Sequence, residues 1–257
     1  MPLPPATLLL LVIALIVAIL TLLHHERVRT GKRVVTLRPL AALDILRRAT
    51  AFGAETGRAV HLSPGAGSIG GRASTAETIA GLLAVERVVT EAAVNGAAVL
   101  ASSGDATTHL ALRGVMRQAY QRAGLGQDYN PANVSLLAHR DPMAYASGVT
   151  TLYGRQRLEA SMLVGSFDQE YLLAAEVGAQ RGIPQLGGAS STTAQPLVYL
   201  ASDAALVGEE IYAADAYLAQ SSIQRARLLT HDALRTVVIV AMIALLVLSA
   251  AGITIQL

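Results

Sequence analysis

The sequence predicts an α/β fold in which a three-layer, mostly parallel sheet of about six strands is flanked by transmembrane helices at the two ends of the chain. Two observations predict it. Along the middle of the chain, short apolar runs alternate with longer amphipathic stretches, and one uncharged apolar run lies near each end. Alternation of this kind is typical of a parallel sheet that has helices on both faces.

The first apolar run, residues 7–23, contains no charged side chain. A helix rises about 1.5 Å per residue, so roughly 20 residues cross a hydrocarbon core of about 30 Å. The run reaches that length only if Pro5, Ala6 and His24 form its interfacial ends. The alternative is a cleaved signal peptide, but residues 1–6 lack the Lys or Arg with which such peptides begin. We expect a transmembrane helix over residues 1–23.

The second apolar run, residues 236–255, also lacks ionisable side chains and predicts a transmembrane helix over residues 236–257. A buried core helix is the alternative, but this run has no polar face with which it could meet water. Two basic juxtamembrane collars, residues 24–39 and 225–235, together hold 8 basic and 2 acidic residues. By the positive-inside rule, the central domain is expected in the cytoplasm of a cell with both short tails outside its inner membrane.

Charge and composition restrict the function of the central domain, residues 40–224. The chain has 20 basic and 18 acidic residues, so 12 and 16 remain after the collars are removed, a net charge of about −4. The pI of about 9.1 therefore reflects the collars, and a nucleic-acid partner is not expected. Cysteine is absent, which excludes disulfides, thiol catalysis and thiolate metal sites.

The domain is expected to open with a helix over residues 40–52. Six strands are predicted at residues 59–63, 97–102, 134–139, 160–165, 184–188 and 204–207. Helices are predicted at residues 75–95, 106–123, 142–156, 168–181 and 192–201, with another from residue 209 into the second apolar run. Because the strands are nearly all apolar without alternation, both faces of the sheet should be covered. This arrangement is Rossmann-like.

Local motifs support these boundaries. Ser74-x-x-Glu77 matches a capping box, and Asp141-Pro142 and Asp168 are typical helix N-caps. Glycines 96, 124 and 182 follow predicted helices, where a left-handed residue often ends the helix.

Small and polar residues recur where each predicted strand ends. In an open parallel sheet, ligands bind beyond the carboxyl ends of the strands, near a switch in strand order. These ends therefore give a candidate binding site for a small anionic ligand, formed by Ser63, Gly65, Gly67, Gly70, Arg72, Ser102, Asp105, His139, Asp141, Gly165, Asp168, Gly187 and Ser190. Glycine would admit either a ligand or a neighbouring backbone, and turn and cap geometry alone also favours Gly, Ser and Asp at such positions.

Gly65-x-Gly67-x-x-Gly70 formally matches the dinucleotide fingerprint, but the match is weak. The next helix is predicted to begin after Ser74 rather than at the last glycine, and the first acid of the next strand end, Asp105, follows 35 residues after Gly70 instead of about 20. Gly71 stands where a Walker loop needs lysine. We expect no NAD, nucleoside triphosphate or other cofactor.

The histidines give little catalytic geometry. His61 lies inside the first strand and is expected to be a hydrogen-bonded core residue. His139, which ends a predicted strand beside Arg140 and Asp141, is the best candidate for chemistry. No Ser/His/Asp order and no His-x-x-x-His spacing is present, so no catalytic residue is assigned and no metal site is expected.

Four segments carry a resemblance to a known family: His61–Gly65, Thr75–Val88 (TAETIAGLLAVERV), Val164–Glu176 (VGSFDQEYLLAAE) and Val207–Leu218 (VGEEIYAADAYL). The chain resembles an uncharacterised family of bacterial membrane-anchored proteins, a domain of unknown function found in filamentous anoxygenic phototrophs and their relatives. The resemblance implies two-helix anchoring and nothing about reaction or substrate.

Three functions remain open. The first is an assembly or scaffold component of a membrane complex, with the lipid bilayer and either copies of itself, as a homo-oligomer, or other subunits as partners. The second is a ligand-binding or sensory module, and the third is an enzyme, each using the strand-end loops for a phosphorylated or nucleotide-like compound. Few catalytic candidates and many small residues on the helical faces favour the first function over an enzyme.

Overall fold

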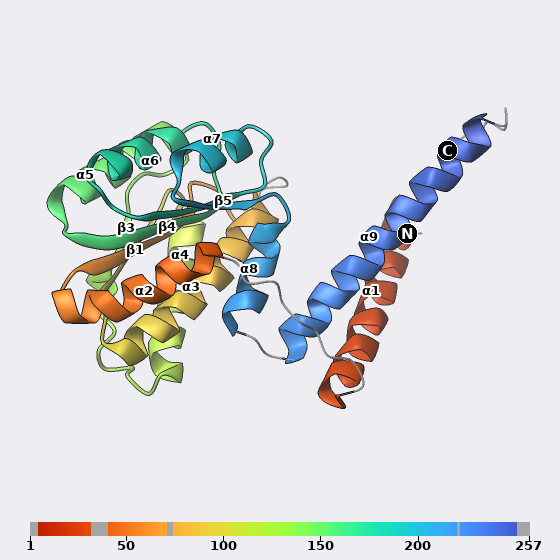
Figure 1. Ribbon diagram of the computed structural model, residues 1–257, viewed down its shortest axis with the longest axis horizontal. Coiled ribbons are helices and arrows are strands. Elements are labelled where there is room, and N and C mark those ends of the chain that lie inside the picture. Colours follow the sequence, from red (N-terminus) through yellow and green to blue (C-terminus); the bar gives the residue numbers. More distant parts are fainter. Residues whose placement is uncertain (1–4, 32–40, 71–73, 220–221, 251–257) are drawn as a thin grey trace. The chain divides into compact units, whose positions relative to one another are not determined.

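The computed structural model describes residues 5–31, 41–70, 74–219 and 222–250. It divides the chain into two compact units, one formed by residues 1–37 and 219–257 and the other by Arg38–Leu218. The first unit contains the two terminal helices and the second contains the sheet (Figure 1).

The terminal unit consists of α1, Pro5–Arg29, and α9, Ser222–Ala250. The two helices contact each other, and His24 Nδ1 on α1 lies 3.2 Å from Thr230 Oγ1 on α9 in a buried hydrogen bond. One helix among the described residues, Leu11–Arg29, is long and apolar enough to cross a membrane, with a mean hydropathy of 1.9. The second span, predicted for residues 236–257, falls partly outside the described residues and stays a prediction. The basic side chains of both predicted collars that the structure describes lie on the helices themselves.

The sheet of the second unit has six parallel strands in the order β3-β2-β1-β4-β5-β6. The strands are β1 Ala59–Gly65, β2 Val99–Ser103, β3 Val134–Leu136, β4 Leu158–Ser166, β5 Gln185–Ala189 and β6 Ala204–Val207. This order is that of the Rossmann fold, in which the strand order reverses between β1 and β4. The predicted α/β class, strand number and parallel pairing are confirmed.

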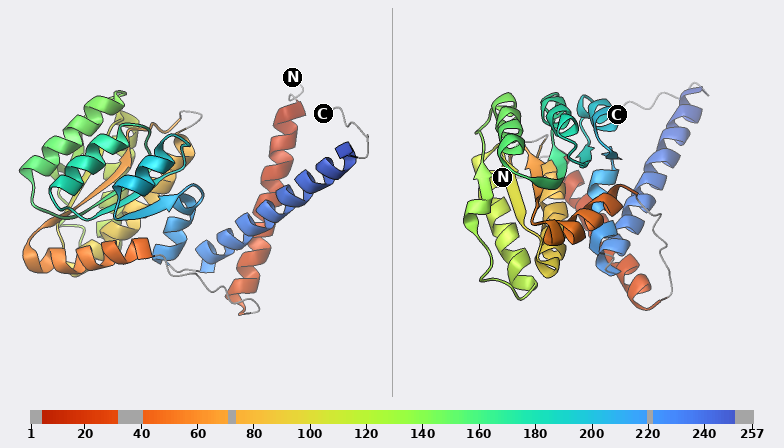
Figure 2. Two further views of the ribbon diagram at one scale, coloured as in Figure 1. Left: turned by 45° about the horizontal axis from the view of Figure 1, so that its top comes forward. Right: turned by 60° about the vertical axis from the view of Figure 1, so that its left-hand side comes forward.

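Seven α-helices lie within the described residues of this unit. They are α2 Ala41–Thr56, α3 Thr75–Asn95, α4 Ala106–Arg122, α5 Pro142–Arg155, α6 Tyr171–Gln180, α7 Ala194–Ala201 and α8 Glu210–Ala219. A short 3-10 helix, η1 Pro131–Asn133, precedes β3. Helices α5, α6 and α7 cover one face of the sheet, and α2, α3, α4 and α8 cover the other (Figures 1 and 2).

Each face has its own hydrophobic core. The core on the α2–α3–α4–α8 face is mainly aliphatic and includes Val60 and Leu62 of β1 with Val85 and Val88 of α3. The α5–α6–α7 face carries three large buried tyrosines, Tyr145, Tyr153 and Tyr171. Helix α3 approaches the sheet closely through Gly81, where an added Cβ would lie 2.2 Å from the Val164 carbonyl oxygen.

Three predicted features are wrong: the end of the third strand, the start of the helix after β4, and the capping hydrogen bond of Ser74, although α3 itself begins after Ser74 as predicted. Strand β3 ends at Leu136 instead of residue 139, because its ladder to β2 ends where Leu136 pairs with Ser103. Helix α6 begins at Tyr171, so Asp168 is not its N-cap. Ser74 makes no capping hydrogen bond, since its hydroxyl donates to the Ser68 carbonyl, 2.9 Å away. By contrast, Asp141 is the N-cap of α5, and Gly96 ends α3 with φ +76°.

Candidate functional site

At the point where the strand order reverses, the end glycines of β1 and β4 lie against the backbone of the neighbouring strand. Gly65 pairs with Ser166 in the ladder, and the Ala66 N–H donates to the Ser166 carbonyl oxygen over 3.2 Å. A Cβ on Gly65 would lie 2.1 Å from that oxygen, and one on Gly165 would lie 2.2 Å from the Pro64 oxygen. These glycines therefore serve close contact between the two strands, in the crevice that ligands occupy in other folds of this topology.

Two further candidate glycines also face protein atoms. A Cβ on Gly67 would lie 2.4 Å from Ser166 Cβ, and one on Gly187 would lie 2.0 Å from the Tyr171 hydroxyl oxygen. Gly70 differs, because nothing lies within 4 Å of its added Cβ and its φ is +101°. Gly70 is thus the one candidate glycine in the described residues that faces open space. Arg72 lies outside the described residues.

Beneath these strand ends, the α5–α6–α7 face of the sheet contains a buried chain of hydrogen bonds. His61 is at its centre, with Nε2 2.9 Å from Ser102 Oγ and Nδ1 3.0 Å from Ser161 Oγ. Ser161 is bonded to Tyr153, and Tyr145 contacts both Ser63 and Ser102. We call this chain the His61 network; its members are His61, Ser63, Ser102, Tyr145, Tyr153 and Ser161. The prediction that His61 is a hydrogen-bonded core residue is confirmed.

The His61 network is electrically neutral near pH 7. Burial lowers the pKa of His61 to about 3. Burial also raises the pKa of Tyr145 to about 12, against the opposing hydrogen bonds from Ser102 and Ser63, and raises the pKa of Tyr153. A general base needs a pKa near the working pH. The network therefore acts as an internal polar brace between the sheet and α5, and Ser63 and Ser102 belong to it.

Asp105 lies at the junction of β2 and α4 and is almost fully buried. Its Oδ1 caps α4 by accepting from the amides of Thr107 and Thr108, at 2.9 and 3.0 Å. Its Oδ2 has no hydrogen-bond partner among the described residues and lies 3.6 Å from His139 Nδ1. That ring nitrogen accepts from the Ala106 amide at 3.2 Å, so in this arrangement it carries no proton to give to Asp105.

Two more buried hydroxyls near this junction lack partners among the described residues. They are Thr78 Oγ1, beside Gly67, and Ser103 Oγ, at the end of β2. Arg140, in the neighbouring loop, has φ +58°, the left-handed conformation that non-glycine residues adopt rarely. We call Thr78, Ser103, Asp105 and His139 the β2–α4 edge. Three of its oxygen atoms have no hydrogen-bond partner among the described residues, and the backbone of the adjacent Arg140 is in a strained conformation.

The remaining candidate side chains have hydrogen-bond partners of their own. Asp141 caps α5 by accepting from the Ala144 amide at 2.9 Å. Asp168 accepts from Ser191 Oγ at 2.7 Å, and Ser190 donates to Glu77 Oε1. The structure thus brings Asp105 to His139, and Gly65 to Gly165, but it places Asp168 and Ser190 with the loop that follows β5.

Sequence reasoning missed the residues that complete these clusters. The hydroxyl groups of Tyr145 and Tyr153 on α5 form hydrogen bonds with serine hydroxyls of the sheet. Glu170 is buried, and this burial is the main cause that raises its pKa. A signal was present in β1, where His61 and Ser63 alternate with Val60 and Leu62. Polar residues at alternate positions of a covered strand indicate a buried polar stripe.

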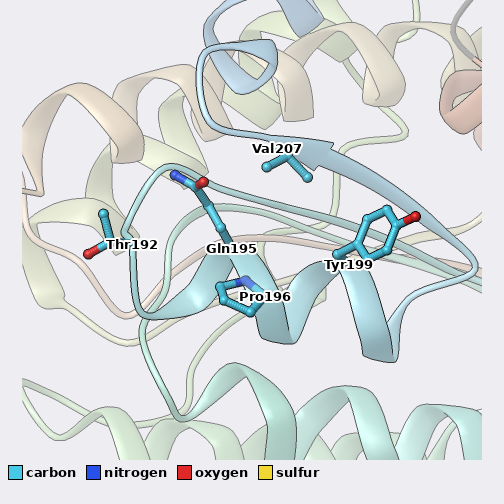
Figure 3. Close-up of a pocket in the computed structure, with 5 residues that line it drawn as sticks. All are labelled: Thr192, Gln195, Pro196, Tyr199 and Val207. Atoms are coloured by element: carbon cyan, nitrogen blue, oxygen red, sulfur yellow. The ribbon is translucent and has the colours of Figure 1, made fainter.

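No group of three or more His, Cys, Asp or Glu side chains that could hold a metal ion is present among the described residues. A surface pocket of about 410 Å³ lies elsewhere, between α7 and β6, and is lined by Thr192, Gln195, Pro196, Tyr199 and Val207 (Figure 3).

These features define a class: a Rossmann-like α/β domain whose end glycines at the switch point pack against neighbouring backbone, on a chain that also carries a helix long and apolar enough to span a membrane. The chain belongs to a family known as a domain of unknown function, DUF6754, whose family model matches residues 5–256. No curated protein and no solved structure matches the chain.

Proposed function

We propose that this protein is an assembly component of a membrane complex, in which the α/β domain binds other protein surfaces instead of turning over a substrate. The observation that carries the proposal is that the end glycines of β1 and β4 at the switch point serve close packing between protein segments. There, Gly65 and Gly165 admit neighbouring backbone, with added Cβ atoms 2.1 and 2.2 Å from carbonyl oxygens. The His61 network adds support, because its groups stay neutral near pH 7 and give no general base.

Anchoring to the inner membrane by both α1 and α9, with the domain in the cytoplasm, is part of the same proposal. Along α1, apolar side chains such as Leu15, Ile16 and Ile19 are about half exposed or more. Exposed aliphatic side chains over a whole helix need a lipid or protein cover. The basic collars at the domain-side ends of both helices favour a cytoplasmic domain.

The test is purification of the full chain in a mild detergent, followed by mass measurement of the protein part of the particle. We expect more than one polypeptide per particle, with chemical cross-links that involve residues of the α/β domain. The same preparation is analysed for small molecules by mass spectrometry. A particle with a single polypeptide and one bound small molecule per chain would overturn the assembly proposal.

A second candidate function is binding of a phosphorylated or nucleotide-like compound at the β2–α4 edge. The observation that favours it is the presence of three buried oxygens without partners among the described residues, on Thr78, Ser103 and Asp105. Buried polar groups are almost always hydrogen-bonded, so these atoms are suited to bind hydroxyl and amine groups of a ligand. In this second case Asp105→Asn, which retains an Oδ1 acceptor for the α4 cap, would remove a co-purifying compound, whereas Asp168→Asn would not.

A further inference from the structure

One side of α1 changes from apolar to basic near the end of the helix that leads to the sheet unit. Leu15, Ile19 and Leu23 follow one another at intervals of four residues, and Arg27 comes next at the same interval. Positions four residues apart are neighbours on a helix surface, so these side chains form a continuous stripe. The three aliphatic side chains are 61%, 49% and 52% exposed, and Arg27 is exposed as well. We call Leu15, Ile19, Leu23 and Arg27 the α1 stripe.

Helix α9 adds arginines at the level of Arg27. The two helices contact each other and run in opposite directions (Figure 1), and the hydrogen bond between His24 and Thr230 fixes which levels of the two helices lie together. Four arginines lie on the sheet-unit side of this contact, two of them three residues from it and two of them five residues from it: Arg27 and Arg227, and Arg29 and Arg225. At about 1.5 Å per residue, all four lie within about 8 Å of the contact along the helix axes. We call them the four-arginine cluster.

Positive charge exceeds negative charge around this cluster. The two collars hold eight basic residues and only two acidic ones, Glu26 and Asp232. Arg29 lies 3.1 Å from a Glu26 carboxylate oxygen, but both side chains are exposed, and an exposed ion pair contributes little. Arg225 is partly exposed, and its Nε has no hydrogen-bond partner among the described residues. Guanidinium groups bind phosphate oxygens through paired hydrogen bonds, so the cluster is suited to a phosphate group.

We propose that the four-arginine cluster binds the phosphate of an anionic phospholipid whose acyl chain lies along the α1 stripe. The proposal rests on the membrane anchoring by α1 and α9 proposed above, and it names the lipid class that this anchor recognises. The excess of positive charge selects an anionic headgroup over a zwitterionic one, in which an amine balances the phosphate. The aliphatic part of the stripe selects a lipid over a soluble phosphate compound, because exposed aliphatic side chains need an apolar cover.

The lipid class is tested on the full chain in a mild detergent. The protein is titrated with phosphatidylglycerol or with phosphatidylcholine of the same acyl chains, and the bound lipid is counted by native mass spectrometry. We expect phosphatidylglycerol to bind about tenfold more tightly. Glycerol 3-phosphate, a headgroup without acyl chains, should not displace it at an equal concentration. Equal binding of the two lipids would overturn the proposal, and displacement by glycerol 3-phosphate would assign the arginines to a soluble compound instead.

A double variant tests the residues. Each arginine near an anionic headgroup strengthens binding about fivefold, so Arg27→Gln with Arg225→Gln should weaken phosphatidylglycerol binding about 25-fold. The matched control is Arg113→Gln with Arg117→Gln, which removes the same charge from exposed positions of α4 and should leave binding unchanged. Far-UV circular dichroism checks that the helices of both variants form. Equal weakening in the two variants would show an effect of net charge alone and would overturn the site.

The outcomes separate this site from the assembly function. A particle of several polypeptides that does not discriminate between the two lipids would end the lipid site and leave the assembly function standing. A single polypeptide without a protein partner that still prefers phosphatidylglycerol would end the assembly function and leave the lipid site standing. Release of the chain from membranes by alkaline carbonate, without detergent, would contradict the anchoring and with it the lipid site.

Discussion

Glycine at a strand end can admit either a ligand or a neighbouring protein backbone, and Gly65 and Gly165 are examples of the second use. A phosphate and a neighbouring carbonyl both require that no Cβ intervene. In this molecule the neighbour is protein, because each added Cβ would lie within 2.2 Å of a carbonyl oxygen of the opposite strand. The positive φ values of +95° and +150° add a conformational reason for glycine.

We predict that Gly165→Ala lowers the free energy of unfolding by about 2–4 kcal/mol, because overpacking and a strained φ both act against it. Gly114→Ala is the matched control. Gly114 is a helical residue of α4 with nothing within 4 Å of its added Cβ, so that change should raise stability by about 0.5–1 kcal/mol. All eight tyrosines lie in the domain, so near-UV circular dichroism during denaturation reports its unfolding. A Gly165→Ala change smaller than 0.5 kcal/mol, about the size of a neutral surface substitution, would contradict this account.

At His61 we predict a pH dependence with a definite sign. Its pKa is about 3 in the folded domain and about 6.5 in an unfolded chain, so the unfolded chain binds more protons between these values. Stability contributed by the neutral imidazole is complete above pH 6.5 and falls as the pH is lowered toward 3, by up to about 1.4 kcal/mol per pH unit. His61→Gln should reduce this slope, measured by denaturation at several pH values. Identical slopes for the two proteins would show that His61 does not cause it.

At the scale of elements, the six strands were predictable because each is a short apolar run, and the helices between them were predictable from their periodicity. The end of β3 was not, because it depends on how many residues β2 offers for pairing, a tertiary property. The start of α6 was also missed, since Asp168 is a favoured N-cap residue whereas Glu170, which occupies the cap position, is not. Only the structure shows Asp168 bonded to Ser191. Strand order likewise depends on crossovers that no local pattern records.

The position of the candidate site was also predictable in part. Parallel pairing places all strand ends at one edge, so loops that are distant in sequence were correctly expected there. Their function was not visible, because a hydroxyl that faces a ligand and one that faces Tyr145 look identical in sequence. Only the packing of α5 shows that Ser63 and Ser102 belong to the His61 network.

The two aspartates give a paired prediction at this scale. Asp141 caps α5 through the Ala144 amide, so Asp141→Ala should lower the free energy of unfolding by about 1 kcal/mol. Asp168 caps no helix, and its exposed carboxylate accepts from Ser191 Oγ. We therefore expect Asp168→Ala to change stability by less than about 0.5 kcal/mol, as for other surface positions. Thermal denaturation of the two variants compares them directly, and a larger effect at Asp168 would reverse the assignment of the caps.

For the whole molecule, the chain divides into a helical unit and a sheet unit, and the proposed function assigns anchoring to the first and binding to the second. The helical unit exposes aliphatic side chains along α1, and the sheet unit has its own two cores. Contact between α1 and α9 is made partly by polar atoms, since His24 bonds to Thr230. A specific polar contact between two helices favours one pairing of their faces over others.

The orientation of the whole molecule in the membrane follows from its charges and can be tested on intact cells. In the anchoring proposed above, the collars hold eight basic residues against two acidic ones, which predicts that the collars stay in the cytoplasm, while residues 1–6 carry no basic side chain and are predicted to cross. Because the parent chain has no cysteine, single thiols at Pro2→Cys and Ser147→Cys, an exposed position of α5, report the two sides without background. A membrane-impermeant maleimide should label Pro2→Cys in intact cells and Ser147→Cys only after permeabilisation. Labelling of Ser147→Cys in intact cells would place the domain outside. Loss of the Pro2 thiol from a shortened chain would instead identify the first apolar run as a cleaved signal peptide.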